Sequence, residues 1–287
     1  MITLIAYSHL MNVTQRNMMM AHAEDAQWVD HVQDETWRVN MKSYEFLGTN
    51  FMPLTLDQTQ SFIAKSNRQV SFKYLVTPNV DHIVRLWKET ATYKPLYDGA
   101  WLSVCDSRIL EILAKLSGIP LSPVPGSDLT ARLFQHEIKP DEPVNVIGGD
   151  DEIIATMKRD FGLTNLNQHV PPWGLKNKPE AIAATAEFVA KNPARFTFIC
   201  VGSPQQEMVA QACEARGDCV GLGLCVGASL EFLTGRVKRA PLWMQKARIE
   251  WLHRLASEPK RLWKRYLIEG PKIFAIWLRW SMGKRLN

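Results

Sequence analysis

The sequence predicts an α/β fold, in which helices cover both faces of a mostly parallel, Rossmann-like sheet and a basic helical appendage follows. Short apolar runs rich in β-branched and aromatic residues alternate with amphipathic stretches of helical length. Most of these runs end in Gly, Pro, Asn, Asp or Ser just before the next helix. Alternation at this spacing is typical of parallel strands joined by crossover helices.

The elements are expected in regular order once the chain passes Phe46. Apolar runs predict strands over 73–76, 102–105, 144–147, 196–201 and 219–224. The run over 46–55 predicts one more strand together with the segment that leaves it. Helical periodicity predicts helices over 56–66, 80–87, 108–116, 153–161, 180–191 and 204–216.

Two further helix starts depend on polar caps. Ser203 is expected to cap the helix that Pro204 opens, since proline suits the first helical turn. A helix is also expected from Gly126, with Ser127 or Asp128 as its cap.

Composition is that of an ordinary globular protein, with 46% hydrophobic and 22% charged residues in 287. No apolar run approaches the roughly 18 residues that a spanning helix needs, and the N-terminus lacks the features of a signal peptide. The cysteines lack CxxC spacing, so we expect reduced thiols in a cytoplasmic protein. They are Cys105, Cys200, Cys213, Cys219 and Cys225.

Charge is distributed unevenly along the chain. Residues 236–287 carry 14 Lys and Arg against 3 Asp and Glu, a net charge of +11, whereas the remainder carries 20 against 26, a net of −6. Five of the ten tryptophans lie in the same basic segment. Basic residues interleaved with tryptophan predict a surface for an anionic lipid or a nucleic acid. We therefore expect an N-terminal extension over 1–45, an α/β catalytic domain over 46–235 and a membrane-docking appendage over 236–287.

Glycine motifs give weak support for a nucleotide cofactor. Gly221, Gly223 and Gly227 form GxGxxxG, one residue longer than the dinucleotide fingerprint, and Gly148-Gly149 is only a doublet. An NAD(P)-binding oxidoreductase stays an alternative, as does a non-catalytic membrane-surface adaptor. The sequence contains no Walker loop, HExxH, GxSxG or Asp-x-Asp motif, so we expect neither a cofactor nor a metal.

Polar residues follow several of the predicted strands, where open α/β sheets bind ligands. The turn Gly202–Pro204 exposes backbone N–H groups that favour an anion such as phosphate. Asp106 is the candidate base, and its alternative role is to cap the helix over 108–116. The other polar residues of this kind are Thr77, Asn79, Gln206 and Glu231.

A series of short motifs resembles the WecG/TagA/CpsF family of glycosyltransferases over 46–267. They are TPN at 77–79, CDS at 105–107, GSDL at 126–129, IGG at 147–149, GSPQQE at 202–207, VGASLEFLTG at 226–235, RAP at 239–241, and EWLHRL and EPKR between 250 and 261.

The resemblance implies an inverting transferase of cell-surface polysaccharide assembly that needs no metal. It would move a hexose or N-acetylhexosamine, with N-acetylmannosamine as one candidate, from a UDP-sugar to a polyprenyl-diphosphate-linked sugar. The partners implied are these two substrates and the anionic inner face of the cell membrane, with no nucleic acid. A homo-oligomer is compatible with the sequence.

The resemblance also implies roles for individual residues. Asp106 matches the family's base, with Thr77 and Asn79 as its neighbours. Ser107 stands where many relatives have Gly, and Glu231 where many have Asp. Nucleotide-sugar contacts are implied for Gly148, Gly202, Pro204, Gln206, Glu207, Gly227 and Glu231, and phosphate or acceptor contacts for Asp128, Arg239, Arg254 and Arg261.

Overall fold

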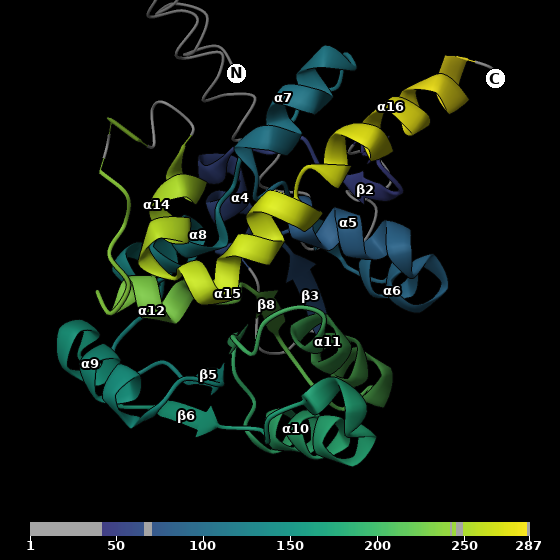
Figure 1. Ribbon diagram of the computed structural model, residues 1–287. Coiled ribbons are helices and arrows are strands. Elements are labelled where there is room, and N and C mark those ends of the chain that lie inside the picture. The colour runs from purple at the N-terminus through teal and green to yellow at the C-terminus, as the bar shows by residue number, and fades with distance from the viewer. Residues whose placement is uncertain (1–41, 66–70, 242, 245–248, 286–287) are drawn as a thin grey trace, which may run out of the picture. The chain divides into compact units, whose positions relative to one another are not determined.

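The computed structural model describes residues 42–65, 71–241, 243–244 and 249–285, so most of the predicted N-terminal extension lies outside the described residues. A six-stranded, all-parallel sheet in the order β4-β3-β8-β7-β5-β6 forms its centre (Figure 1). The α/β prediction is therefore confirmed. The strands are β3 (Lys73–Val76), β4 (Leu102–Ser103), β5 (Val144–Ile147), β6 (Leu166–His169), β7 (Phe196–Ile199) and β8 (Leu222–Cys225).

Helices cover both faces of this sheet. Ile199 of β7 packs in one hydrophobic cluster with α6 (Thr90–Asp98), α10 (Pro179–Lys191) and α11 (Gln205–Arg216). On the opposite face, the ring of Phe134 lies 4.8 Å from that of Phe198. The remaining helices of the α/β part are α4 (Leu56–Ile63), α5 (Val80–Lys88), α7 (Arg108–Leu116), α8 (Gly126–Arg132), η1 (Leu133–Glu137), α9 (Asp151–Phe161), η2 (Leu175–Asn177) and α12 (Ser229–Leu233).

The prediction of one strand over 46–55 is wrong. This region contributes to an antiparallel hairpin, β1 (Tyr44–Phe46) and β2 (Thr49–Phe51), which forms a sheet of its own. Leu47 and Gly48, with φ of 54° and 88°, make the two-residue turn, in which positive φ at both positions matches the twist of the strands.

Both predicted serine or aspartate caps are also wrong. Helix α11 begins after Pro204, and the Ser203 hydroxyl instead accepts a hydrogen bond of 2.9 Å from Arg85 Nη1. Helix α8 begins after Pro125 without a side-chain cap, and Asp128 forms an ion pair with Arg239. In each case, an arginine far away in the sequence binds the side chain that was expected to cap the helix.

The C-terminal segment is helical: α14 (Glu250–Ser257), α15 (Pro259–Trp263), η3 (Lys264–Glu269) and α16 (Lys272–Arg285). In the sequence, Trp243, Ala247, Trp251 and Leu255 recur every four residues and predict one apolar stripe, of which Ala247 lies outside the described residues. Ile273 of α16 is buried against β1, α5 and α7, and Trp277 Nε1 donates to Ser117 Oγ at 2.8 Å. The run Ile273, Phe274, Ile276, Trp277 and Trp280 is apolar enough for the sequence to predict that it enters lipid headgroups. This prediction is wrong for Ile273, Ile276, Trp277 and Trp280, which pack on the body.

Candidate active site

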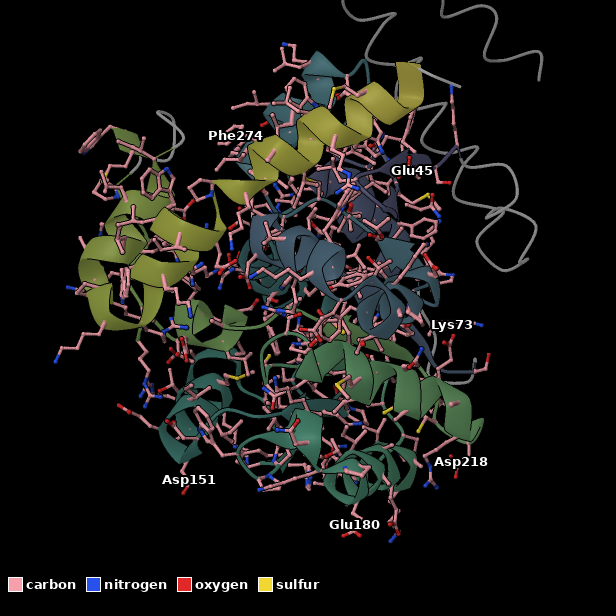
Figure 2. All side chains as sticks on the ribbon, turned by 45° about the vertical axis from the view of Figure 1, so that its right-hand side comes forward. Glu45, Lys73, Asp151, Glu180, Asp218 and Phe274 are labelled. Carbon is pink, nitrogen blue, oxygen red and sulfur yellow. The ribbon has the colours of Figure 1, made fainter. Side chains whose placement is uncertain are left out.

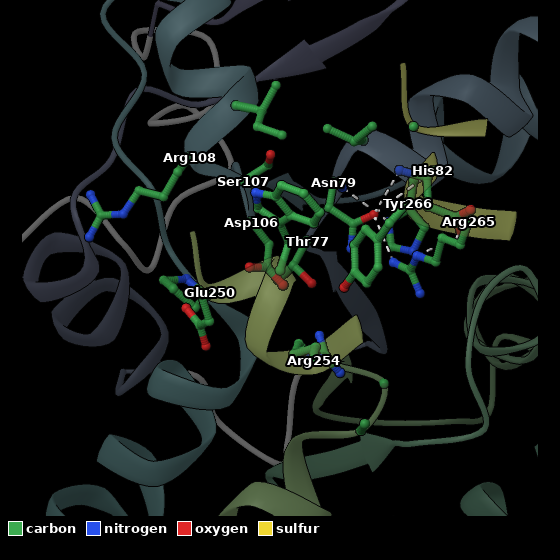
Figure 3. Close-up of a pocket in the computed structure, with 18 of the residues that line it drawn as sticks. Thr77, Asn79, His82, Asp106, Ser107, Arg108, Glu250, Arg254, Arg265 and Tyr266 are labelled. Carbon is green, nitrogen blue, oxygen red and sulfur yellow. Dashed lines mark hydrogen bonds and ion pairs between the residues drawn. The ribbon is translucent and has the colours of Figure 1, made fainter. Parts of the chain in front are cut away.

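A cavity of about 740 Å³ opens where β4, β3, β8 and β7 end. Asp106 follows β4, Thr77 follows β3, Gly227 follows β8 and Gly202 follows β7, and all four line the cavity. Helices α14 and α15, η3 and the start of α16 form its other side (Figure 3). The sheet and the basic tail therefore build one site together.

Asp106 lies in this cavity with its carboxyl group largely buried. Its backbone N–H donates to Pro78 O at 3.0 Å, which fixes the strand exit. Ser107, not Asp106, caps α7, accepting a hydrogen bond from Leu110 N at 3.2 Å. Asp106 therefore does not have the alternative role of capping this helix.

The electrostatic surroundings raise the pKa of Asp106 to about 7. Burial is the main cause, because it penalises the charged carboxylate. A hydrogen bond from the Gly126 N–H and the charge of Arg254 lower this pKa, while Asp128 and Glu250 raise it. Glu250 and Arg254 both belong to α14 and are labelled in the same part of the site as Asp106 in Figure 3. A carboxyl group with this pKa can accept a proton near neutral pH.

Thr77 and Asn79 hold the end of β3 in place beside this carboxyl group. Thr77 Oγ1 donates to Cys225 O at 3.2 Å and so links β3 to β8. Asn79 caps α5, since its Oδ1 accepts from the N–H of Asp81 at 3.1 Å and of His82 at 3.4 Å. The sequence grouped both residues with Asp106, and all three line the same cavity.

Several lining residues were not identified as site residues from the sequence. His82 Nδ1 accepts from the Asn79 N–H at 3.2 Å, and burial with the charges of Arg265 and Arg85 lowers the pKa of His82 to about 3. The imidazole is therefore neutral. Asp81 pairs with Arg85 at 2.5 Å and lies 3.8 Å from Arg265 Nε. The four-residue spacing of Asp81 and Arg85 was the one sequence signal for this group.

The three predicted tail arginines all line the cavity but differ in their partners. Arg239 pairs with Asp128, and Arg261 forms two hydrogen bonds with Glu258, of 2.5 and 2.7 Å. Arg254 lies 5.1 Å above the Phe232 ring, and its buried Nε makes no hydrogen bond to any residue that the structure describes. Arg254 is thus the arginine best placed to receive an anion.

The sequence model of the glycosyl transferase WecG/TagA/CpsF family matches residues 44–287, which include every residue of this cavity. The chain belongs to the WecG/TagA/CpsF family. It is therefore a glycosyltransferase of cell-surface polysaccharide synthesis, with a sugar donor and a lipid-linked acceptor as its general substrates. Family membership favours this activity over an oxidoreductase or an adaptor.

In this WecG/TagA/CpsF glycosyltransferase, the predicted donor-side residues do not all reach the cavity. Gly202, Gln206 and Gly227 line it, whereas Pro204, Glu207, Glu231 and Gly148 do not. A Cβ at Gly148 would lie 3.0 Å from Cys200 O, so this glycine allows the ends of β5 and β7 to approach closely. Glu207 is fully buried behind Gln206.

In the described part of the chain, no group of three or more His, Cys, Asp or Glu side chains is arranged to hold a metal ion. Asp150 caps α9 and pairs with Arg236. No described helix is both long and apolar enough to cross a bilayer.

Proposed function

We propose that this glycosyltransferase is an inverting, metal-independent enzyme that transfers a hexose or N-acetylhexosamine from a UDP-sugar to a polyprenyl-diphosphate-linked sugar. The observation that carries the proposal is that a carboxyl group of raised pKa, Asp106, and the guanidinium of Arg254, whose Nε has no hydrogen bond within the described residues, line the same cavity. Inversion requires one base and one means of stabilising the leaving diphosphate.

The reaction would proceed as a single displacement. Asp106 removes the proton from the acceptor hydroxyl as that oxygen attacks the anomeric carbon of the donor sugar. The bond from this carbon to the UDP oxygen breaks on the opposite face, and UDP leaves with the electron pair. Arginine side chains and the backbone N–H groups after β7 stabilise the diphosphate, the task that a metal performs in other transferases.

A thermal-shift screen across UDP-sugars tests the donor class. UDP and one UDP-sugar should raise the melting temperature, because a ligand that binds only the native state stabilises it, whereas NAD(P) should not. Transfer from that UDP-sugar to a soluble lipid-diphosphate-sugar analogue should then survive excess EDTA. A shift with NAD(P) alone would contradict the donor class, and loss of activity in EDTA that Mg²⁺ or Mn²⁺ restores would contradict metal independence.

Membrane docking of the tail is the second part of the proposal, and the structure changes which residues would carry it. Phe274, Leu278 and Met282 recur every four residues on α16 and are 51%, 53% and 58% exposed. Phe274 lies on the first turn of this helix, next to the cavity it lines (Figure 2). Each nearby Lys or Arg adds about 1 kcal/mol of attraction to an anionic surface. We propose that this stripe inserts at the cytoplasmic leaflet and presents the lipid-linked acceptor to the site.

Replacing Phe274, Leu278 and Met282 together by Ser should therefore abolish sedimentation with vesicles of anionic phospholipid. Transfer to a soluble acceptor analogue should fall only a few-fold. The matched control is Trp173→Ser, which removes a side chain that is 97% exposed on the loop after β6. Wild-type binding should weaken as salt rises. Undiminished vesicle binding by the triple variant would show that α16 is not the docking surface.

A further inference from the structure

A chain of two hydrogen bonds runs from the loop after β8, which lines the cavity, to a buried carboxyl group. The Gly227 N–H donates to Gln206 Oε1 at 2.9 Å. Gln206 Nε2 in turn donates to Glu207 Oε1 at 2.8 Å. Gln206 is 2% exposed and Glu207 is 0% exposed, so water does not compete for these contacts.

The Gln206 amide thus has protein partners at both ends. Its oxygen faces the backbone of Gly227 and its nitrogen faces Glu207. If the amide were rotated by 180°, its NH₂ group would face the Gly227 N–H and its oxygen would face a carboxyl oxygen. Both contacts would then be repulsive in a buried setting, where an unsatisfied polar group is costly. The Gly227 N–H and the Glu207 carboxyl group therefore determine together which way the Gln206 amide points.

The loop held by this amide is part of the site. Val226, Gly227, Ala228 and Ser229 line the cavity between β8 and α12. Gly227 has a φ of +57°, in the left-handed region, so its conformation is not one that most side chains favour. The Gln206 oxygen accepts from the N–H of this residue and so fixes the loop where it lines the cavity.

Glu207 itself contributes no surface to the cavity, and a buried carboxyl group needs a structural reason. Its Oε2 is buried and makes no hydrogen bond to the residues that the structure describes. Burial raises its pKa, which hydrogen bonds from Gln206 and Ser203 and the charge of Arg85 partly offset. The Oε1 atom of Glu207 is the acceptor presented to Gln206.

We propose that Glu207 is a positioning residue which, through the Gln206 amide, holds the Gly227 loop in the shape that receives the donor nucleotide. The inference rests on the proposed function in naming a nucleotide as the ligand. In this role neither Gln206 nor Glu207 needs to contact the UDP-sugar. What matters is that Gln206 supplies a hydrogen-bond donor and Glu207 the matching hydrogen-bond acceptor.

An exchange of the two side chains tests this directly. Gln206→Glu alone places two carboxyl groups against each other, and should weaken UDP affinity by about 10-fold or more and speed deuterium exchange of the Gly227 amide. The double variant Gln206→Glu/Glu207→Gln restores the pattern. In it, the new amide at position 207 can donate to one oxygen of the new carboxylate at position 206, while the other oxygen accepts from the Gly227 N–H.

The UDP affinity and amide protection of the double variant should therefore return to within a few-fold of wild type. The matched control is Glu214→Gln on the same helix, at a part-exposed ion pair with Lys73, and this variant should stay near wild type.

Slow exchange of the Gly227 amide in Gln206→Glu would overturn the proposal, as would a double variant that fails to recover protection while its melting temperature is normal. If Gln206 contacts the donor directly, the double variant should recover protection but not UDP affinity, which also overturns it. The exchange measurement needs no substrate, so it separates failure of this inference from failure of the proposed function. Should Gln206→Glu not fold, recovery of folding by the double variant supports the pairing, and its UDP affinity then decides the positioning role.

Discussion

Asp106→Asn should lower kcat by about 10²–10⁴-fold while leaving UDP affinity within a few-fold of wild type. Asn preserves the size of the side chain but cannot accept the proton of the acceptor hydroxyl. The measurement is steady-state transfer together with UDP titration by calorimetry. Asp98→Asn, at an exposed ion pair of α6, is the control and should be inert. Turnover near the wild-type value in Asp106→Asn would refute the role of base.

The pKa of Asp106 gives this variant two further signatures. Wild-type kcat/KM should rise with pH through about 7, as the carboxyl group loses its proton, and that limb should be missing from any residual activity of the variant. The folded-state pKa is raised, so the associated stabilisation is complete below the usual value of 3.8 and is lost as pH rises through about 7. Asp106→Asn should therefore melt above wild type at about pH 8, and the difference should shrink toward about pH 4.

The buried strands are the part of the fold that the sequence predicts best. A strand covered on both faces needs a mostly apolar run, and Lys73–Val76 and Val144–Ile147, each with three apolar residues in four, are predicted to the residue. The start of β8 is missed by three residues. A Cβ at Gly221 would lie 2.1 Å from Ala194 O, a close approach between distant segments that no local pattern reveals.

The predictions of the helix caps and of the packing of the tail fail for a related reason. Ser203 has the local properties of a helix cap, but its hydroxyl accepts a hydrogen bond from Arg85, 118 positions earlier in the sequence. The sequence correctly predicts that 273–280 is helical. It cannot say whether lipid or protein covers the apolar face, and the structure places Phe46, Ile83 and Leu110 against it.

The site shows the same division between local and long-range information. Residues at strand ends, such as Thr77 and Asp106, are predictable because parallel strands end at one edge of a sheet. The ion pairs that surround them join residues far apart, such as Arg265 with Asp81, and depend on how the tail packs. The sequence therefore indicates which arginines are available but not which of them already have a carboxylate partner.

Arg254→Ala should lower kcat by about 10²–10³-fold, the usual loss when one donor to a developing negative charge is removed. The buried Nε of Arg254 makes no hydrogen bond within the described residues, so its donor capacity is available to the leaving diphosphate. Arg261→Ala is the matched control in the same cavity. Its effect should be smaller, since Arg261 is already bonded to Glu258 by two hydrogen bonds.

Arg254 also lowers the pKa of Asp106, so its removal should have a second effect that mere loss of packing would not produce. Without the positive charge, the carboxylate is less favoured, and the acid limb of kcat/KM should move to higher pH. Arg254→Lys keeps the charge but not the planar fork; it should leave the limb near its wild-type position while recovering only part of kcat. These point variants are preferable to truncation after Gly235, which would also remove Ile273 from the core. A limb that stays in place in Arg254→Ala would show that this arginine does not act on the base.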